Sequence, residues 1–373
     1  MRFETELKDY FDVKYCFLVS SGKAALTLIL NALKNLYPDK DQVIIPAFTC
    51  YSVPSAIVRA GLKIELCDMD TEKLDFDFGQ LSKTINNSLL CIIPAHLFGM
   101  PSDIDHLRSI LGDNEAVVVE DAAQAMGGKW EGEKLGTFGD VSFFSLGRGK
   151  AISTVEGGVI LTNRDDIAQN ISALLNDASP YHTLEILRLM IEAVSLTLLM
   201  RPSLFWFPKA LPCLNLGETI YDPNFKIRKM SPFQAGMAKS WKKKISKFQN
   251  RRSRNAKAWV NLLKSLKTNE LSAVDAYPDS DLIRFPVNVD DPSLRKAILK
   301  QSEIKGLGIM PTYPDTINGI EELRNMFAGQ EFPVAKKYSQ QLITLPVHPF
   351  VKKTDIMKIT REIRNAIKQT RRI

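Results

Sequence analysis

The segment that decides the fold reads Val117-Val118-Val119-Glu120-Asp121-Ala122-Ala123-Gln124. Its apolar run predicts a strand that is buried on both faces, as in a parallel sheet, and two acids close the strand. Ligands of open α/β sheets bind beyond the carboxyl ends of the strands, so these carboxylates lie where a ligand would. Three roles are open for them: holding a proton on the pyridine nitrogen of a ligand, binding a metal ion, or capping the helix that follows.

Short apolar runs alternate with helical periodicity on both sides of this strand. Helical spacing at 24–36 and 104–111 completes a pattern that predicts an α/β domain with a mostly parallel sheet flanked by helices. The other strands predicted there are 43–47, 63–69, 89–94, 141–146 and 158–162. A smaller C-terminal α+β domain is predicted from strands at 281–289 and 342–346 and an amphipathic helix near 354–368. We expect a large domain over 1–245 and a small one over 246–373.

A turn of small residues opens the long apolar helix at 24–36. It reads Ser20-Ser21-Gly22-Lys23. The first N–H groups of a helix lack partners and carry partial positive charge, so this end can hold a phosphate, to which Lys23 adds a full charge. The alternative is that the turn only caps the helix.

A loop with a single lysine follows the predicted strand at 141–146. It runs through Gly147-Arg148-Gly149-Lys150, and Glu156-Gly157-Gly158 follows closely. A lysine held against an apolar site loses its charge more easily and becomes a nucleophilic amine that can form a Schiff base. Taken alone, Lys150 is more often a surface lysine.

Together and in this order, these elements resemble the DegT/DnrJ/StrS group of nucleotide-sugar aminotransferases. That family has Ser-Gly-Thr at a helix start, then Pro-x-x-Thr, Glu-Asp-Ala-Ala-Gln, Gly-x-x-Gly-Asp, Phe-Ser-x-x-x-x-Lys and Glu-Gly-Gly. The counterparts here are Pro46-Ala47-Phe48-Thr49, Glu120-Asp121-Ala122-Ala123-Gln124, Gly136-Thr137-Phe138-Gly139-Asp140, Phe144-Ser145 with Lys150, and Glu156-Gly157-Gly158. The resemblance covers nearly the whole chain. It implies pyridoxal 5'-phosphate (PLP) as the cofactor and PLP fold type I as the fold.

The resemblance also implies a role for each matched residue. Lys150 would form the Schiff base with the cofactor and carry the proton during the reaction. Asp121 would pair with the pyridine nitrogen, and Gln124 would lie against the ring near its phenolic oxygen. The phosphate would be held by Gly22, Lys23 and Ser145.

The reaction implied by the resemblance is transamination. An amino acid, L-glutamate, would give its nitrogen to a keto sugar carried on a nucleotide, in the synthesis of cell-surface polysaccharides or aminosugars. Family members work as homodimers with sites at the subunit interface. Two alternatives are a sugar dehydratase or eliminase and a non-enzymatic, membrane-associated member. Lys150 argues against the first, because dehydratases of the family commonly have histidine there, and the retained Asp121, Gln124 and Ser145 argue against the second.

Several positions depart from the family pattern. Lys23 replaces a threonine, and Cys50 stands where an aromatic residue often stacks on the cofactor ring, with Tyr51 beside it as a substitute. Arg148 lies in a segment that replaces aromatic-Pro-Thr, and it is either a contact for a substrate phosphate or carboxylate or a solvated loop residue. The asparagine that binds phosphate across the subunit interface in the family is replaced by Ile227.

A hydrophobic insertion occupies about residues 180–215. Glu185, Arg188 and Glu192 share one narrow helical face, apolar residues fill the rest, and Phe205-Trp206-Phe207 follows between prolines. The wide apolar face is either buried in the core or a dimer interface, or it lies in a membrane surface, with 183–207 as a peripheral contact. The basic run at 239–257 would then add attraction to anionic lipid.

Composition and charge limit the binding partners and the cellular location that can be expected. The net charge of +7 has a local source in 239–257, which contains no acid. This run is either a solvated helix face or a nucleic-acid contact, and because no nucleic-acid motif accompanies it, we expect no nucleic-acid partner. Five scattered cysteines show no metal spacing, and the N-terminus turns acidic at once. We therefore expect no metal, no secretory signal and a cytoplasmic location, with at most peripheral membrane contact.

Overall fold

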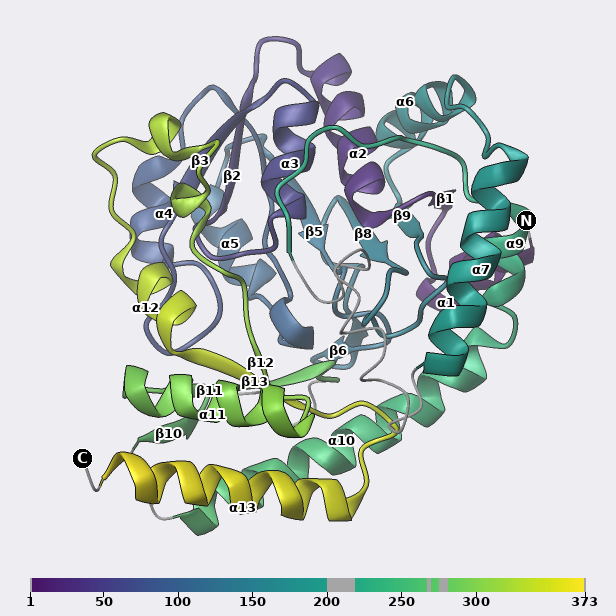
Figure 1. Cartoon of the computed structure of the whole chain (residues 1–373). Coiled ribbons are helices and arrows are strands. Elements are labelled where there is room, and N and C mark those ends of the chain that lie inside the picture. Colours follow the sequence, from purple (N-terminus) through teal and green to yellow (C-terminus); the bar gives the residue numbers. More distant parts are fainter. Residues whose placement is uncertain (1, 200–218, 267–269, 275–280, 372–373) are drawn as a thin grey trace.

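The larger of the two main sheets has seven strands in the order β1-β9-β8-β5-β4-β2-β3. The computed structural model describes residues 2–199, 219–266, 270–274 and 281–371 (Figure 1). The strands of this sheet are β1 (Tyr15–Val19), β2 (Gln42–Pro46), β3 (Lys63–Cys67), β4 (Leu89–Ile92), β5 (Val117–Asp121), β8 (Val141–Ser145) and β9 (Gly158–Thr162). Strand β9 is antiparallel to both of its neighbours, β1 and β8, and every other adjacent pair in the sheet is parallel. The predicted mostly parallel α/β sheet is confirmed.

Helices cover both faces of this sheet, which explains the uninterrupted apolar strands. Val117 and Val119 of β5 pack on the same side as helices α2, α3 and α6, whereas Val118 packs with α4 and α5. Successive side chains of a strand point to opposite faces, so a strand covered on both sides must be apolar at every position. The helices are α2 (Gly22–Leu36), α3 (Ser52–Arg59), α4 (Phe78–Thr84), α5 (Ile104–Leu111) and α6 (Asp165–Asn176).

Helix α10 (Trp241–Leu266) joins the larger sheet to the C-terminal part of the chain. Near its start, Trp241 packs edge-on against Phe3 of α1 (Arg2–Phe11), with ring centroids 5.9 Å apart. Further along, the Trp259 indole N–H donates to the carbonyl of Pro346 over 3.0 Å. We propose that the boundary between the two domains lies along this helix, which contains residue 245.

The basic run at 239–257 lies mostly on the solvent face of α10, as one of the two interpretations of the sequence predicted. Lys243 and Lys247 are exposed. Arg252 is the exception, because it is buried and forms a two-bond ion pair with Asp281, at 3.0 and 2.7 Å. A structural role therefore accounts for one arginine of the run.

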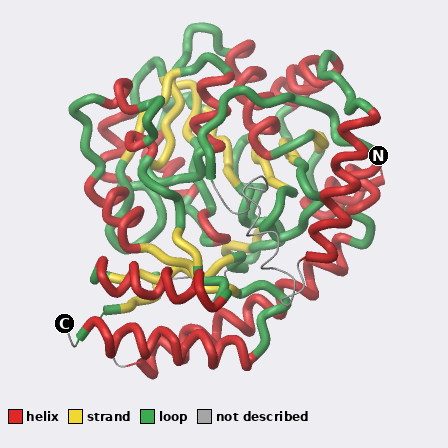
Figure 2. Tube along the Cα trace, in the orientation of Figure 1, coloured by secondary structure: helices red, strands yellow, loops and turns green. Residues whose placement is uncertain are grey.

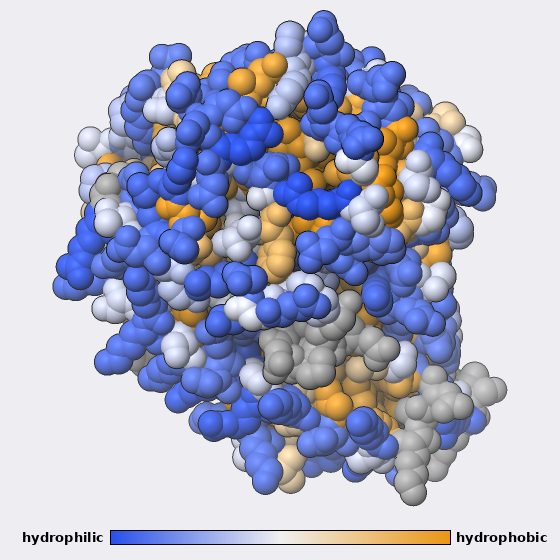
Figure 3. Space-filling model, turned by 180° about the vertical axis from the view of Figure 1, so that it is seen from behind, coloured by the Kyte–Doolittle hydropathy of each residue, from blue (hydrophilic) through white to orange (hydrophobic). Residues whose placement is uncertain are grey.

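The C-terminal part is built on an antiparallel sheet of four strands in the order β10-β11-β13-β12. Helices α11 and α13 contact each other, and α11 also contacts β11 and β12. Figure 2 shows the strands of both sheets inside and the helices outside. From behind, apolar residues gather in patches set among hydrophilic ones (Figure 3). The elements are β10 (Leu271–Ala273), β11 (Arg284–Val289), α11 (Pro292–Lys305), β12 (Met310–Pro311), α12 (Pro333–Gln341), β13 (Leu342–Pro346) and α13 (Lys353–Thr370).

Helix α7 (Thr183–Leu199) forms the first part of the hydrophobic insertion and turns its apolar side to solvent. Leu184 is 78% exposed and Ile191 is 58% exposed. The prediction that this face is buried in the core is therefore wrong for α7, because the core contacts are made by the other side of the helix. Residues 200–215, with Phe205-Trp206-Phe207, lie outside the described residues. Within the described ranges, no helix is long and apolar enough to cross a membrane.

Candidate active site

The carboxyl ends of the parallel strands bring the predicted site residues to one edge of the larger sheet. Asp121 ends β5, Ser145 ends β8, and Cys50 follows β2 after a short loop. Helix α2 begins at the same edge, because β1 and β8 are both antiparallel to the strand between them. Residues that are far apart in the sequence therefore meet where open α/β sheets bind ligands.

Glu120, the first acid of the segment at the end of β5, has a structural role. It is fully buried and bonded to His96, with 2.7 Å between Nε2 and Oε1. The backbone N–H of Ser102 donates to Nδ1 of this histidine over 2.9 Å, so Nε2 carries the proton and donates to the carboxylate. Backbone N–H groups of the loop at 136–139 also donate to Glu120. In the described part of the chain, no group of three or more His, Cys, Asp or Glu is placed to hold a metal ion.

Asp121 is the acid that faces the site. Its side chain is buried, and the N–H of Ala123 donates to Oδ1 over 3.0 Å. Burial raises the pKa of this carboxyl, opposed by that hydrogen bond and then by the positive charge of Lys150. A buried carboxylate whose charge is only partly compensated favours a cationic ligand group beside it.

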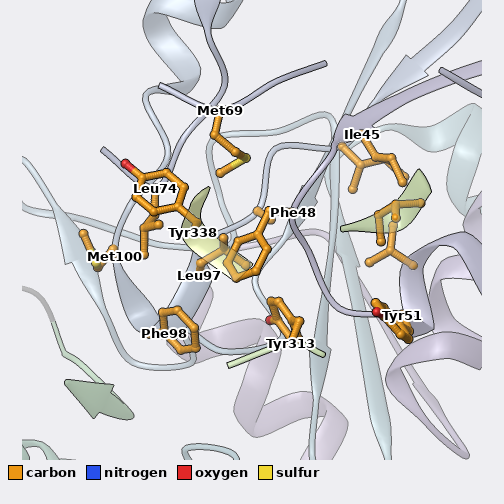
Figure 4. Close-up of a cluster of buried hydrophobic side chains, with 14 of the residues drawn as sticks. Ile45, Phe48, Tyr51, Met69, Leu74, Leu97, Phe98, Met100, Tyr313 and Tyr338 are labelled. Carbon is orange, nitrogen blue, oxygen red and sulfur yellow. The ribbon is translucent and has the colours of Figure 1, made fainter. Parts of the chain in front are cut away.

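Gln124 is fixed from two sides. The N–H of Phe98 donates to its Oε1 over 3.1 Å, and its Nε2 donates to the hydroxyl of Tyr313 over 2.7 Å. Figure 4 shows Tyr313 beside Phe48 and Phe98, and the ring centroids are 5.2 and 6.2 Å from that of Tyr313. Burial raises the pKa of Tyr313 well above its ordinary value, so the phenol stays protonated. The amide of Gln124 therefore has one defined orientation at the site.

The start of α2 and the end of β8 approach each other closely. Ser21 caps α2 by accepting a hydrogen bond from the N–H of Ala24 over 3.1 Å. A Cβ on Gly22 would lie 3.0 Å from the Cβ of Ser145, so a larger residue would crowd the Ser145 hydroxyl. Both the capping role and the predicted phosphate cradle fit this geometry, because free N–H groups of the first turn lie beside a hydroxyl.

The side chain of Lys23 contacts a loop beyond α7. Its Nζ lies 3.1 Å from Oδ2 of Asp222 and 4.4 Å from the ring centroid of Phe225. It is therefore neutralised by a carboxylate in this structure, and its role as a phosphate ligand stays a prediction. The sequence did not indicate this pair, because the partners are almost two hundred residues apart.

Lys150 lies in the irregular loop between β8 and β9 and is half-buried. Its positive charge opposes the rise in the pKa of Asp121, so the two side chains are within electrostatic reach of each other. Arg148 is exposed in this loop, and its charge acts on the half-buried Glu156. The solvated interpretation of Arg148 fits this position.

Cys50 and Tyr51 occupy the loop between β2 and α3. Cys50 is half-buried, and it is close enough to Tyr313 to contribute to the raised pKa of that phenol. The hydroxyl of Tyr51 accepts a hydrogen bond from the N–H of Asp315 over 2.8 Å, which fixes this ring between the two parts of the chain. The neighbouring Thr49 has a buried hydroxyl with no partner among the described residues. A buried oxygen without a hydrogen bond lowers the stability of the fold, so this position favours a polar ligand that can bond to it.

The segment at 227–230 lies along the edge strand β1. The N–H of Ser20 donates to the carbonyl of Arg228 over 3.0 Å, and the N–H of Met230 donates to the carbonyl of Leu18 over 3.1 Å. Ile227, at the position of the family's asparagine, packs partly buried against the core. Arg228 is buried and reaches Glu185 of α7, with 2.8 Å between Nη2 and Oε1.

One residue beside the site was missed in the sequence. Tyr313 follows a two-residue strand and has no local pattern that marks it. His96, which lies in a segment that fits the family pattern, follows β4, and its ring holds Glu120 in place.

The comparisons with known proteins agree with this geometry. The model of the DegT/DnrJ/EryC1/StrS aminotransferase family matches residues 1–364. The chain belongs to this family. A GDP-perosamine synthase of Vibrio cholerae is 34% identical to it over 175 residues. That match covers 47% of this chain and 47% of the relative, so the chain spans about half of that curated relative's length.

Solved structures share the fold of this DegT/DnrJ/EryC1/StrS family member over nearly its whole length. DesI, crystallised in the presence of its TDP-sugar product, is 21% identical, with a TM-score of 0.78 and coverage of 100% of this chain and 85% of DesI. NtdA of Bacillus subtilis, with bound pyridoxamine phosphate, is also 21% identical, with a TM-score of 0.76 and coverage of 98% and 76%. At this identity the likeness establishes the fold, PLP fold type I, as predicted.

Proposed function

We propose that this protein is a PLP-dependent aminotransferase that transfers an amino group from an amino acid, L-glutamate, to a keto sugar carried on a nucleotide. The observation that carries the proposal is the buried carboxyl of Asp121, within electrostatic reach of Lys150, at the sheet edge where the start of α2 meets Ser145. Membership of an aminotransferase family supports the reaction class. The names of a GDP-perosamine synthase relative and of DesI with its TDP-sugar support a nucleotide-linked sugar.

The residues present fit PLP. Asp121 is a buried carboxyl that forms no ion pair with a described residue, which suits a protonated pyridine nitrogen beside it. The first turn of α2 and the Ser145 hydroxyl form an anion site of the kind that binds phosphate. Gln124 is oriented by Tyr313, and the orphaned hydroxyl of Thr49 offers a further hydrogen bond.

Each of these residues then has a defined task. When bound, PLP supplies a carbonyl that takes up the amino group and a ring that accepts electrons. Lys150 would hold the cofactor through its Nζ and, once released, would move a proton between the substrate carbon and the cofactor. Asp121 would keep the proton on the ring nitrogen, and Gln124 would orient the ring. The amino acid leaves as a keto acid, and the keto sugar leaves as an amino sugar.

The test is a transamination assay on the PLP-loaded protein. L-glutamate carrying isotopically labelled nitrogen is supplied with a panel of nucleotide-linked keto sugars, with a GDP-linked sugar first. We expect the label to appear in the sugar product and the visible absorbance of the protein-bound cofactor to change on adding the donor. A sugar that loses water without gaining the label identifies a dehydratase. A protein that takes up no PLP identifies a non-enzymatic member, and either outcome overturns the proposal.

We further propose that the protein works as a homodimer in the cytoplasm. Buried free thiols support a reducing compartment: Cys16, Cys67 and Cys91 are buried and unpaired, and burial raises the pKa of Cys67 to about 12. The family resemblance supports the dimer. A peripheral membrane contact through 183–207 is the competing proposal for the insertion.

Tyr313→Phe tests whether the phenol positions Gln124. The variant loses the 2.7 Å hydrogen bond to Nε2. We expect kcat/KM to fall about tenfold, because a buried hydrogen bond of this kind contributes about 1 kcal/mol or more. We also expect a shifted absorbance maximum of the bound cofactor, which a purely structural role would leave unchanged.

Tyr338→Phe is the matched control. Tyr338 is also buried, and its hydroxyl donates to the carbonyl of Asp70 over 2.9 Å, away from the site residues. This variant should lose a similar amount of thermal stability and keep both kcat/KM and the absorbance maximum. Equal effects of the two substitutions on kcat/KM would contradict the positioning role of Tyr313.

A further inference from the structure

The loop that contacts Lys23 is attached to the helices beside the site. Residues 219–226, here called the crossing segment, run past α3 and α2 toward β1 (Figure 1). The backbone N–H of Asp222 donates to Oγ of Ser55 over 3.0 Å, and Nη1 of Arg59 donates to the carbonyl of Pro223 over 3.1 Å. Both partners belong to α3, so this helix fixes the position of the crossing segment.

Two side chains of the crossing segment hold the amine of Lys23. Its Nζ lies 3.1 Å from Oδ2 of Asp222 and 4.4 Å from the ring centroid of Phe225. The guanidinium of Arg59 lies 4.8 Å from the same centroid. A cation over an aromatic face is attracted by the ring, so Phe225 adds to the attraction of the carboxylate.

Asp222 keeps its position without help from Lys23. Its Oδ1 accepts a hydrogen bond from the N–H of Asn224 over 2.8 Å, and its own N–H is bonded to Ser55. The pKa of Asp222 is lowered: partial burial raises it, but the hydrogen bonds from Asn224 and Lys23, together with nearby positive charge, more than offset this. The carboxylate is therefore ionised and fixed by its own loop.

Lys23 is the movable partner of this ion pair. Its backbone lies in the first turn of α2, next to Gly22, which contacts Ser145. The free N–H groups of this turn favour an anion, and a lysine amine is a point charge on a flexible four-carbon stem. The side chains of Lys23 and Asp222 are 28% and 43% exposed, so solvent weakens their attraction. An anion at the start of α2 and the carboxylate of Asp222 therefore compete for one amine.

We propose that Asp222 is a positioning residue that competes with the cofactor phosphate for Lys23. In the empty site, Asp222 holds the amine on the crossing segment. When the phosphate is bound, the amine moves to it, and Asp222 keeps its bonds to Asn224 and Ser55. The affinity for the cofactor is then lower than the start of α2, Ser145 and a free lysine would give. This inference rests on the proposed function, because it takes PLP as the ligand.

The binding of pyridoxamine phosphate and of pyridoxamine to the cofactor-free protein tests the competition. Neither compound has an aldehyde, so Lys150 cannot form a Schiff base with it, and the two differ only in the phosphate. Asp222→Asn keeps the shape of the side chain and removes its charge. We expect isothermal titration calorimetry to show about fivefold tighter binding of pyridoxamine phosphate, the upper end for a partly exposed ion pair. The affinity for pyridoxamine should stay unchanged.

Asp165→Asn is the matched control. Asp165 also pairs with a lysine, Lys14, at 3.2 Å, but it follows β9 at the opposite edge of the larger sheet. This variant should bind both compounds as the wild type does. Lys23→Ala should weaken the binding of pyridoxamine phosphate. Adding Asp222→Asn to Lys23→Ala should then have a much smaller effect than Asp222→Asn alone, because the amine for which the two anions compete is absent.

The ratio of the two affinities separates the possible results. If Asp222→Asn leaves this ratio unchanged while the wild type binds pyridoxamine phosphate, the competition is disproved and the proposed function stands. Equal weakening of both compounds also overturns the competition, because it shows that Asp222 only holds the crossing segment in place. A wild-type protein that binds neither compound overturns the proposed function, and this inference with it.

Discussion

Lys150→Ala is expected to remove nearly all transamination. The amine of this residue is both the attachment point of the cofactor and the group that moves the proton, and loss of a positioned acid-base group costs about 10²- to 10⁴-fold in rate. The effect should appear in kcat, measured by transfer of labelled nitrogen from L-glutamate to the sugar. The protein should still bind PLP through the start of α2 and Ser145, but with the absorbance of the free aldehyde.

Two further variants distinguish the chemical role of the Lys150 amine from the effect of its positive charge. Lys150→Arg keeps a positive charge near Asp121 but cannot form a Schiff base, so it should be as inactive as the alanine variant. Lys129→Ala removes an exposed lysine on β6 (Lys129–Trp130) and should have wild-type activity. Wild-type turnover by Lys150→Ala would show that another residue performs these tasks.

Six of the seven strands of the larger sheet could be predicted because their cause is local, whereas the edge strand β1 was not predicted. A strand covered by helices on both faces is expected to be an apolar run, and β4 and the first three residues of β5 are such runs. The short strands β10 and β12 were not predicted. They have three and two residues, and they form only because β11 and β13 offer unpaired backbone groups beside them.

The site could be predicted only where its residues follow a strand or begin a helix. Asp121, Ser145 and Gly22 have such positions, and the structure brings them to one edge. The contacts of Tyr313 and Lys23 were not predicted, because each joins segments that are distant in the chain. Such contacts are set by tertiary packing, for which the local sequence contains no signal.

Helix α7 illustrates a different limit. Periodicity shows that a helix has an apolar face, but it does not show whether that face packs against its own chain. Arg228 and Lys226 decide this by binding Glu185, so the polar side faces inward and the apolar side outward. The cations that set the orientation lie about forty positions further along the chain, beyond the range of any pattern within the helix.

Asp121→Asn is expected to lower kcat by about 10²-fold or more, which corresponds to a barrier increase of several kcal/mol. The amide keeps the shape of the side chain but cannot hold a proton on the ring nitrogen, so the ring accepts electrons poorly. The donor half-reaction, followed by stopped-flow absorbance, should show the loss directly. A change confined to KM, with kcat intact, would contradict this role.

The same substitution, which lowers kcat, should raise the stability of the cofactor-free protein. Burial raises the pKa of Asp121, so between the ordinary carboxyl pKa and the raised value the folded state binds more protons than the unfolded state. The free energy of unfolding therefore falls as the pH rises through this window, and above the window the ionised carboxyl destabilises the empty site. Asp121→Asn removes this cost.

The expected result is a cofactor-free variant with a Tm at neutral pH equal to or above that of the wild type, and a smaller gain in Tm on acidification. With PLP bound, the order should reverse, because the cationic ring nitrogen then favours the ionised carboxyl of the wild type. Thermal unfolding of both proteins, with and without PLP, between acidic and neutral pH measures all four states. If the cofactor-free variant is less stable than the cofactor-free wild type, the prediction is wrong. The contacts of Asp121 then stabilise the fold by more than the burial of its charge destabilises it.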